Sequence, residues 1–179
     1  MQPIAVAISD ENVGRRAKLE HLLHGEPGIK ILTNVKSSEI HMVRDRRLLP
    51  RTNITTVEDK VARVRRLKPR VLFVNMKQCI DEEFAMLVSL RRECPQTLVV
   101  LLADELDQQE DQVIKALESG ARGYLDVKAD AFNLNLSKAV HVVDRGEAWV
   151  PRKMLGNIMS EISFWCQLSS GGGQLDPAG

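Results

Sequence analysis

Five short apolar runs are spaced along the chain, and helical patterns separate them. The runs have the length and the bounding turn residues of buried strands, and they cover residues 4–8, 29–35, 70–75, 98–103 and 123–125. Elsewhere apolar side chains recur every three or four residues, which predicts helices over residues 15–23, 55–67, 81–92, 108–119, 131–145 and 151–168. Strands alternating with helices predict an α/β fold, a doubly wound sheet of five parallel strands in the flavodoxin-like order 2-1-3-4-5, with an extra C-terminal helix.

Local signals mark several ends of these elements. Thr55 precedes a helical pattern with Glu58 three residues later, the arrangement of a capping box. Gly120 follows one helix as a stop signal, and Pro151 opens the last helix at a favoured first-turn position. Residues 98–103 are continuously apolar, as expected of a central strand buried on both faces.

Composition fits a globular domain with appendages. The chain has 179 residues, 44% of them apolar and 27% charged. No apolar run approaches the roughly 20 residues of a membrane span, and the N-terminus lacks a basic leader segment, so we expect a cytoplasmic protein. Cys79, Cys94 and Cys166 are odd in number and widely spaced, which predicts free thiols.

Charge is unevenly distributed. The net charge is +1, yet residues 44–70 contain ten Lys or Arg and three Asp or Glu. A basic segment of this kind could contact nucleic acid or an acidic partner; a solvated helix and loop is the interpretation we favour. Residues 36–54 are expected to form a basic insertion in a domain that spans residues 1–150. Residues 169–179 have the Ser and Gly composition of a flexible linker or tail.

Ligands of doubly wound sheets bind beyond the carboxyl ends of the strands, an edge that we call the strand mouth. The predicted strands bring Asp10, Glu11, Asn75, Ala103 and the loop after Leu125 to this edge.

Two segments resemble response-regulator receiver domains. Residues 120–125, Gly-Ala-Arg-Gly-Tyr-Leu, resemble the fifth-strand signature of receivers, most closely those of NarL/LuxR-type transcription regulators. Residues 144–151, Asp-Arg-Gly-Glu-Ala-Trp-Val-Pro, are similar to the phrase that closes the last receiver helix and starts a linker helix. The resemblance covers roughly residues 3–168 outside the basic insertion. It implies a receiver-like domain over residues 1–150 and a linker helix over residues 151–168.

The residues that carry receiver chemistry differ here. The resemblance aligns Asn75 with the phosphorylated aspartate, Leu102 with the hydroxyl residue and Val127 with the lysine, although Lys128 follows one position later. An amide cannot form an acyl phosphate, and a leucine cannot donate a hydrogen bond to a phosphate. These four positions therefore form a degenerate phosphorylation site, as expected of a pseudo-receiver.

One acidic pair remains at the strand mouth. Asp10 and Glu11 align with the family's two magnesium-binding carboxylates. They form either a weak magnesium site or a charge pair that favours a helix N-terminus; no other cofactor is expected. The chain has no Gly-rich phosphate loop, nucleophile elbow or metalloprotease helix, so we do not expect an enzyme.

The resemblance implies a phosphorylation-independent regulatory domain of a DNA-binding transcription regulator. DNA would be bound only through a helix-turn-helix domain that follows this chain. The alternatives are a stand-alone protein-interaction module and a small-ligand sensor at the strand mouth. We expect a homodimer, and the apolar stripe of the last helix supplies the candidate interface residues Met154, Ile158, Ile162, Phe164 and Trp165.

Overall fold

The computed structural model describes residues 2–32, 56–104, 110–152, 154–160 and 163. The chain divides into two units, Met1–Trp149 and Val150–Gly179, and each is described by itself. Among the described residues, no helix has the length and apolar character that a membrane crossing requires.

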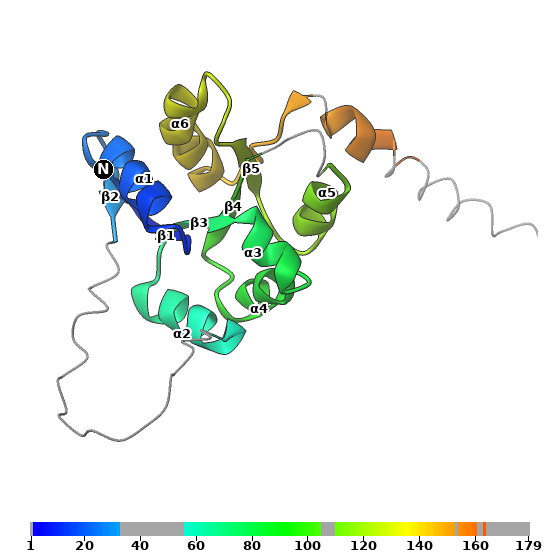
Figure 1. Ribbon diagram of the computed structural model, residues 1–179, viewed down its shortest axis with the longest axis horizontal. Coiled ribbons are helices and arrows are strands. Elements are labelled where there is room, and N and C mark those ends of the chain that lie inside the picture. The colour runs from blue at the N-terminus through cyan, green and yellow to red at the C-terminus, as the bar shows by residue number, and fades with distance from the viewer. Residues whose placement is uncertain (1, 33–55, 105–109, 153, 161–162, 164–179) are drawn as a thin grey trace, which may run out of the picture. The chain divides into compact units, whose positions relative to one another are not determined.

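The first unit is built on a parallel sheet of five strands in the order β2-β1-β3-β4-β5, which confirms the predicted fold class (Figure 1). All four pairings between neighbouring strands are parallel. The strands are β1 (Ile4–Ser9), β2 (Ile29–Ile31), β3 (Val71–Asn75), β4 (Leu98–Ala103) and β5 (Gly123–Asp126).

Helices cover both faces of this sheet. Helix α6 packs against β1, β3 and β5 beside α1, whereas α2 packs against α4 on the other face (Figure 1). The helices are α1 (Val13–His24), α2 (Val57–Leu67), α3 (Met76–Asp81), α4 (Ala85–Glu93), α5 (Glu110–Glu118) and α6 (Phe132–Asp144).

Two details of the predicted helices are wrong. The helix expected over 81–92 begins only at Ala85, as α4, because Glu83 and Phe84 take positive φ angles of 49° and 61° and separate it from α3, which was not expected. The capping box of α2 lies one residue later than expected. Thr56 accepts a hydrogen bond from the Asp59 amide, and the Asp59 carboxylate accepts one from the Thr56 amide in return.

Most other predicted bounds agree with the structure within two residues where it describes them, and strand β4 has the predicted limits. Strand β2 is shorter than predicted: it ends at Ile31, Leu32 lies outside it, and residues 33–35 fall outside the described ranges. Helix α5 begins at Glu110, and α6 lies within the predicted range. The expected basic insertion falls on residues outside the described ranges, as do the first residues expected for α5.

One core cluster lies between the sheet and helices α1 and α6. It is fully apolar, and each strand contributes at least one side chain that packs in it or against it. Burial of each large apolar side chain stabilises the fold by roughly 1.5–3 kcal/mol. The largest contributors include Phe73, Leu19, Leu23, Leu102 and Leu136, all under 2% exposed.

A further backbone segment pairs with the outer strand of the sheet. Trp149 bridges to Gly123 in parallel fashion, and its carbonyl accepts a hydrogen bond from the Tyr124 amide at 2.8 Å. The Trp149 amide in turn donates to the Arg122 carbonyl at 3.0 Å. Glycine suits position 123, because a Cβ there would lie 3.2 Å from the Trp149 carbonyl oxygen, which is closer than ordinary van der Waals contact.

In the second unit, residues 154–160 are helical. Met154 is buried and Ile158 is half-buried, whereas Leu155 and Met159 are exposed. The other candidate interface residues, Ile162, Phe164 and Trp165, lie outside the described residues, as does the expected linker over 169–179.

Candidate functional site

The strand mouth gathers charged and polar side chains that leave four different strands. Asp10 follows β1 directly, Asn75 ends β3, Asp104 follows β4, and Asp126 ends β5. Strands β1, β3, β4 and β5 are successive neighbours in the sheet. Their carboxyl ends therefore form one polar edge, as the sequence predicts for Asp10 and Asn75.

Asp10 is fully enclosed and already paired. Its side chain is 0% exposed, and its carboxylate accepts hydrogen bonds from Arg15 Nε, from Arg15 Nη2 at 3.1 Å and from the Asn12 amide at 2.9 Å. Arg15 lies in the first turn of α1, where the Asn12 side chain caps the helix through the Arg15 amide. The guanidinium fork matches the carboxylate geometry, so both oxygens of Asp10 are used.

The same guanidinium also reaches the end of β4. Arg15 Nη1 lies 3.2 Å from both carboxylate oxygens of Asp104. The hydrogen bond from Arg15 to Asp10 raises the pKa of the guanidinium above its usual value, and the Asp104 charge adds to this. Arg15 therefore stays positively charged and connects the ends of β1 and β4.

Glu11 does not join Asp10 in a shared site. Its side chain is 81% exposed, and its carboxylate lies 3.8 Å from Lys60 Nζ. Lys60 is itself almost buried and ion-paired with Glu82 from the end of α3. Each of the two acidic residues at the end of β1 therefore pairs with a different cation of the chain.

The described residues of the strand mouth do not fit a magnesium ion. Magnesium requires a close set of charged oxygen ligands and gives up its waters reluctantly. In the described ranges, no three His, Cys, Asp or Glu side chains are placed to hold a metal ion. At the position where a receiver would need the cation, Asp10 contacts the Arg15 guanidinium.

Asn75 serves the local backbone. Its Oδ1 accepts a hydrogen bond from the Lys77 amide at 2.9 Å and so caps α3, while its Nδ2 lies 3.4 Å from Asp10 Oδ1. An asparagine is favoured at this capping position because its short side chain satisfies an otherwise unpaired helix amide.

The other candidate positions follow the sheet. Leu102 is 0% exposed and belongs to the core cluster, and Val127 is half-buried against that cluster. The Val127 amide donates to the Ala103 carbonyl at 2.9 Å, which extends the pairing of β4 and β5. Lys128 is exposed, and its amide donates to Asp126 Oδ1.

A small polar hollow of about 160 Å³ opens beside Glu11 and Asn75. Leu102 and Val127 do not line it. Three carboxylate side chains do, so the hollow is acidic. Two acceptor atoms of its lining side chains, Gln78 Oε1 and Glu82 Oε2, are buried and accept no hydrogen bond within the described part of the chain. The hollow is lined by Glu11, Asn75, Lys77, Gln78, Asp81 and Glu82.

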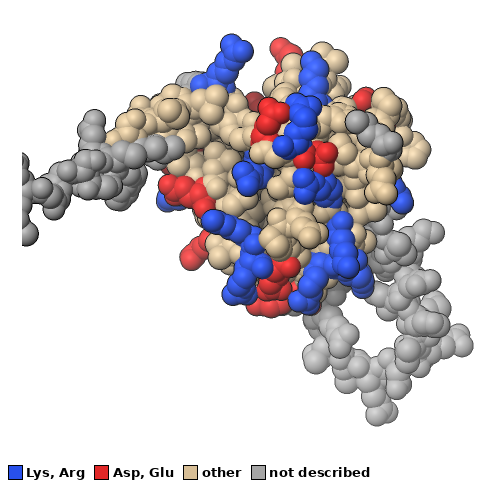
Figure 2. Space-filling model, turned by 180° about the vertical axis from the view of Figure 1, so that it is seen from behind, with Lys and Arg blue, Asp and Glu red and all other residues tan. Residues whose placement is uncertain are grey.

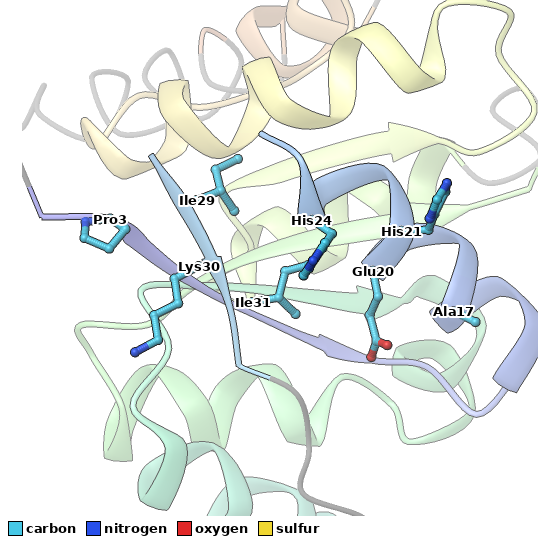
Figure 3. Close-up of a pocket in the computed structure, with 8 residues that line it drawn as sticks. All are labelled: Pro3, Ala17, Glu20, His21, His24, Ile29, Lys30 and Ile31. Atoms are coloured by element: carbon cyan, nitrogen blue, oxygen red, sulfur yellow. The ribbon is translucent and has the colours of Figure 1, made fainter. Parts of the chain in front are cut away.

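A larger open hollow, of about 650 Å³, lies between α1 and β2 (Figure 3). His21 and His24 line it from the helix, and both are exposed. Ile29 and Ile31 line it from the strand. It contains none of the candidate site residues.

The described cysteines, Cys79 and Cys94, are free and buried. Burial raises the pKa of the Cys79 thiol to about 12, with Glu82 adding to the effect. The pKa of Cys94 is raised for the same main reason. Thiols held in the neutral form are poor nucleophiles, so these two have a packing role. Cys166 lies outside the described residues.

Sequence reasoning placed Asp10 at the site but missed its partners. Arg15, Asp104, Lys60 and Glu82 had no assigned role, although two signals were available. Arg15 lies about one helical turn beyond Asn12, the residue that caps the helix after Asp10. Asp104 is the first residue after a buried strand. The pairing of Lys60 with Glu82 has no local signal, because 22 residues separate them.

Three solved structures with the same fold are response regulators or their receiver domains. The isolated receiver domain of RcsB from Salmonella enterica serovar Typhimurium matches with a TM-score of 0.63 and 11% identity, covering 88% of this chain and 98% of that one. A LuxR family DNA-binding response regulator from Silicibacter pomeroyi matches with a TM-score of 0.56 and 23% identity, covering 84% and 98%. The receiver domain of the putative response regulator NarL from Mycobacterium tuberculosis gives 0.56 and 14%, covering 82% and 100%.

No family model matches the sequence, and neither does any curated protein. The identities to the solved structures are all below 25%, so the similarity defines the fold. The first unit has the fold of a receiver domain.

Proposed function

We propose that this chain is the receiver-like regulatory domain of a DNA-binding transcription regulator and that it works without phosphorylation. The observation that carries the proposal is the Arg15 guanidinium, which contacts Asp10 and Asp104 at the strand mouth. A phosphorylated receiver needs a divalent cation at this place to offset the phosphoryl charge. Here a cation of the chain itself neutralises the carboxylates.

The nucleophile supports the same conclusion. The Asn75 amide cannot attack a phosphoryl group to form an acyl phosphate. Its oxygen is also engaged, since it accepts the Lys77 amide and caps α3. The residue therefore contributes to local structure.

The switch residues point the same way. In a phosphorylated receiver, a hydroxyl at the end of β4 would turn towards the phosphoryl group, and a lysine would pair with it. Leu102 is instead enclosed in the core, and Val127 packs against that core. A signal would then have to enter as a ligand, a partner or a change in assembly.

Incubation with acetyl phosphate and magnesium tests the proposal. We expect the intact mass to be unchanged, because Asn75 offers no carboxylate. The matched variant is Asn75→Asp, which supplies the nucleophile alone; we expect poor modification, because Arg15 and Leu102 remain. A phosphoryl adduct on the unaltered chain contradicts the proposal.

The proposed role in DNA binding depends on the formation of a homodimer. A domain that is not phosphorylated can still hold two DNA-binding domains together, and paired half-sites require a symmetric dimer. The candidate interface is the apolar stripe of the last helix. Within the described part, Ile158 is half-buried and remains a candidate, whereas Met154 is buried and is not accessible to a partner. Light scattering at micromolar concentration should give a dimer mass, and removal of residues 151–179 should give a monomer. A monomer in both cases removes this role and favours a stand-alone interaction module.

A small-ligand sensor is the second candidate. It is favoured by the two buried acceptor atoms beside the polar hollow, Gln78 Oε1 and Glu82 Oε2. A buried acceptor without a donor costs about 1–3 kcal/mol, so a small donor-rich molecule would recover that free energy. A thermal-shift screen of small amines tests this candidate, with Gln78→Leu as the variant that should lose the response.

A further inference from the structure

The opposite edge of the first unit carries a strongly basic surface. It lies where α2 and α4 end, and we define it by Arg65, Arg66, Lys68, Arg91 and Arg92, all exposed. Helices α2 and α4 lie side by side (Figure 1). Lys and Arg side chains gather over the lower half of the face drawn in Figure 2.

Ion pairs tie this surface into one patch. Glu93 accepts from Arg65 at 3.4 Å and from Arg92 at 3.1 Å, so a single carboxylate joins the two helices. Arg91 lies on the other side of α4, where its side chain would be 3.2 Å from a Cβ at Gly120. The row of cations therefore continues from α2 across α4 to the turn after α5.

Most of this charge has no internal partner. Within the described ranges, no carboxylate lies within ion-pair distance of Arg66, Lys68 or Arg91. Arg65 and Arg92 share the Glu93 carboxylate. Helix C-termini attract cations, which accounts for a few basic residues in the last turns. It does not account for five cations against one carboxylate.

We propose that this basic surface contacts the phosphate backbone of duplex DNA. Four of the five cations are arginines, whose planar fork binds phosphate oxygens in pairs. Among the described residues of α2 and α4, Val88 is the only exposed large apolar side chain, and no exposed side chain is aromatic. A protein partner would be expected to meet an aromatic or apolar centre. Phosphate contacts need none, and they position a protein without reading sequence.

The contact goes beyond the proposed function, which assigns DNA binding to a further domain. Affinity for a mixed-sequence duplex should fall with salt, with a slope of about −0.9 per phosphate contact. Five contacts predict a loss of about 500-fold between 50 and 200 mM salt.

The test compares two triple variants of the full chain by fluorescence anisotropy with a 20-base-pair duplex, about two helical turns. Arg66→Gln, Lys68→Gln and Arg91→Gln together should reduce the salt-dependent loss to about tenfold. Lys18→Gln, Lys115→Gln and Lys138→Gln remove the same charge from exposed sites on α1, α5 and α6 and should leave the salt-dependent loss unchanged. The remaining sequence, Arg44–Arg51 included, is identical in both variants.

Three results would overturn the proposal. They are absence of duplex binding at 50 mM salt, an equal decrease in slope for both variants, and tighter binding of polyglutamate than of duplex DNA. The last result would assign the surface to an acidic protein. Circular dichroism of both variants checks that the fold is intact.

Discussion

The two edges of the sheet treat basic residues in opposite ways. At the strand mouth, Arg15 and Lys60 are largely buried, and each contacts two carboxylates. At the other edge, Arg66, Lys68 and Arg91 are exposed and have no carboxylate within ion-pair distance in the described residues. The same side-chain types therefore serve structure at one edge and remain available to a partner at the other. Burial and pairing, rather than residue type, decide which role a cation has.

The largest expected effect is the loss of Asp10. Asp10→Ala leaves the Arg15 guanidinium with only Asp104 and removes the enclosed carboxylate that accepts hydrogen bonds from Arg15 and from the Asn12 amide. Hydrogen bonds to a charged group stabilise a fold by about 1.5–3 kcal/mol. We expect the free energy of unfolding to fall by about 2–3 kcal/mol in urea denaturation.

Asp104→Asn is the matched control for this prediction. The Asp104 side chain is 53% exposed, so its loss should cost under about 1 kcal/mol. An equal decrease in the free energy of unfolding for both variants would contradict the claim that the enclosed Asp10 stabilises the fold more than the exposed Asp104 does.

The next effect is a pH dependence that comes from Cys79. Burial raises the pKa of its thiol from 9.0 to about 12. Above about pH 9 the unfolded chain releases this proton while the folded chain keeps it. The unfolded state then binds fewer protons, so stability falls as pH rises, by at most about 1.4 kcal/mol per pH unit.

Urea denaturation between pH 8 and 10 measures this slope. Cys79→Ala should be less stable at pH 8 because it leaves a small cavity, and its stability should decline less steeply with pH. Identical slopes for the two proteins would show that the thiol titrates normally.

A smaller change in stability is expected when Arg15, the cation of the strand mouth, is removed. Arg15→Gln frees the Asp10 and Asp104 carboxylates, so magnesium should stabilise this variant by about 1.4 kcal/mol at ten times its dissociation constant. The unaltered chain should not respond. A magnesium-dependent rise in melting temperature of the unaltered chain would show that Arg15 does not exclude the metal.

The smallest effect on stability is expected at the basic surface. Glu93→Gln removes one exposed carboxylate and should change the free energy of unfolding by under about 0.5 kcal/mol. It frees Arg65 and Arg92, so duplex affinity at 50 mM salt should rise severalfold. Unchanged duplex affinity would show that these two arginines do not contact the DNA.

The parts of the fold that depend on local pattern could be predicted from the sequence. Strand β4 and the sheet order follow from a continuous apolar run and from the alternation of elements. Helix α3 was missed because it starts immediately after β3, with Asn75 both ending the strand and capping the helix. The left-handed residues Glu83 and Phe84 that separate α3 from α4 carry none of the usual glycine signal.

The candidate site was predicted in position but not in chemistry. Asp10 and Asn75 lie at the strand mouth because strand ends are readable from apolar runs. The contact between Arg15 and Asp104 joins residues 89 positions apart, and no spacing rule relates them. Which cation neutralises a buried carboxylate is decided by three-dimensional packing.

Pairing of Trp149 with the outer strand has a consequence for how the sheet can grow. Hydrogen bonds to Trp149 occupy backbone groups of Arg122 and Tyr124 that an outer strand would otherwise offer to another chain. An exposed strand edge is a template for foreign strands, and this edge is partly closed. The other edge is β2, which spans only Ile29–Ile31 in the sheet. The domain thereby gains some protection from polymerising through its own sheet.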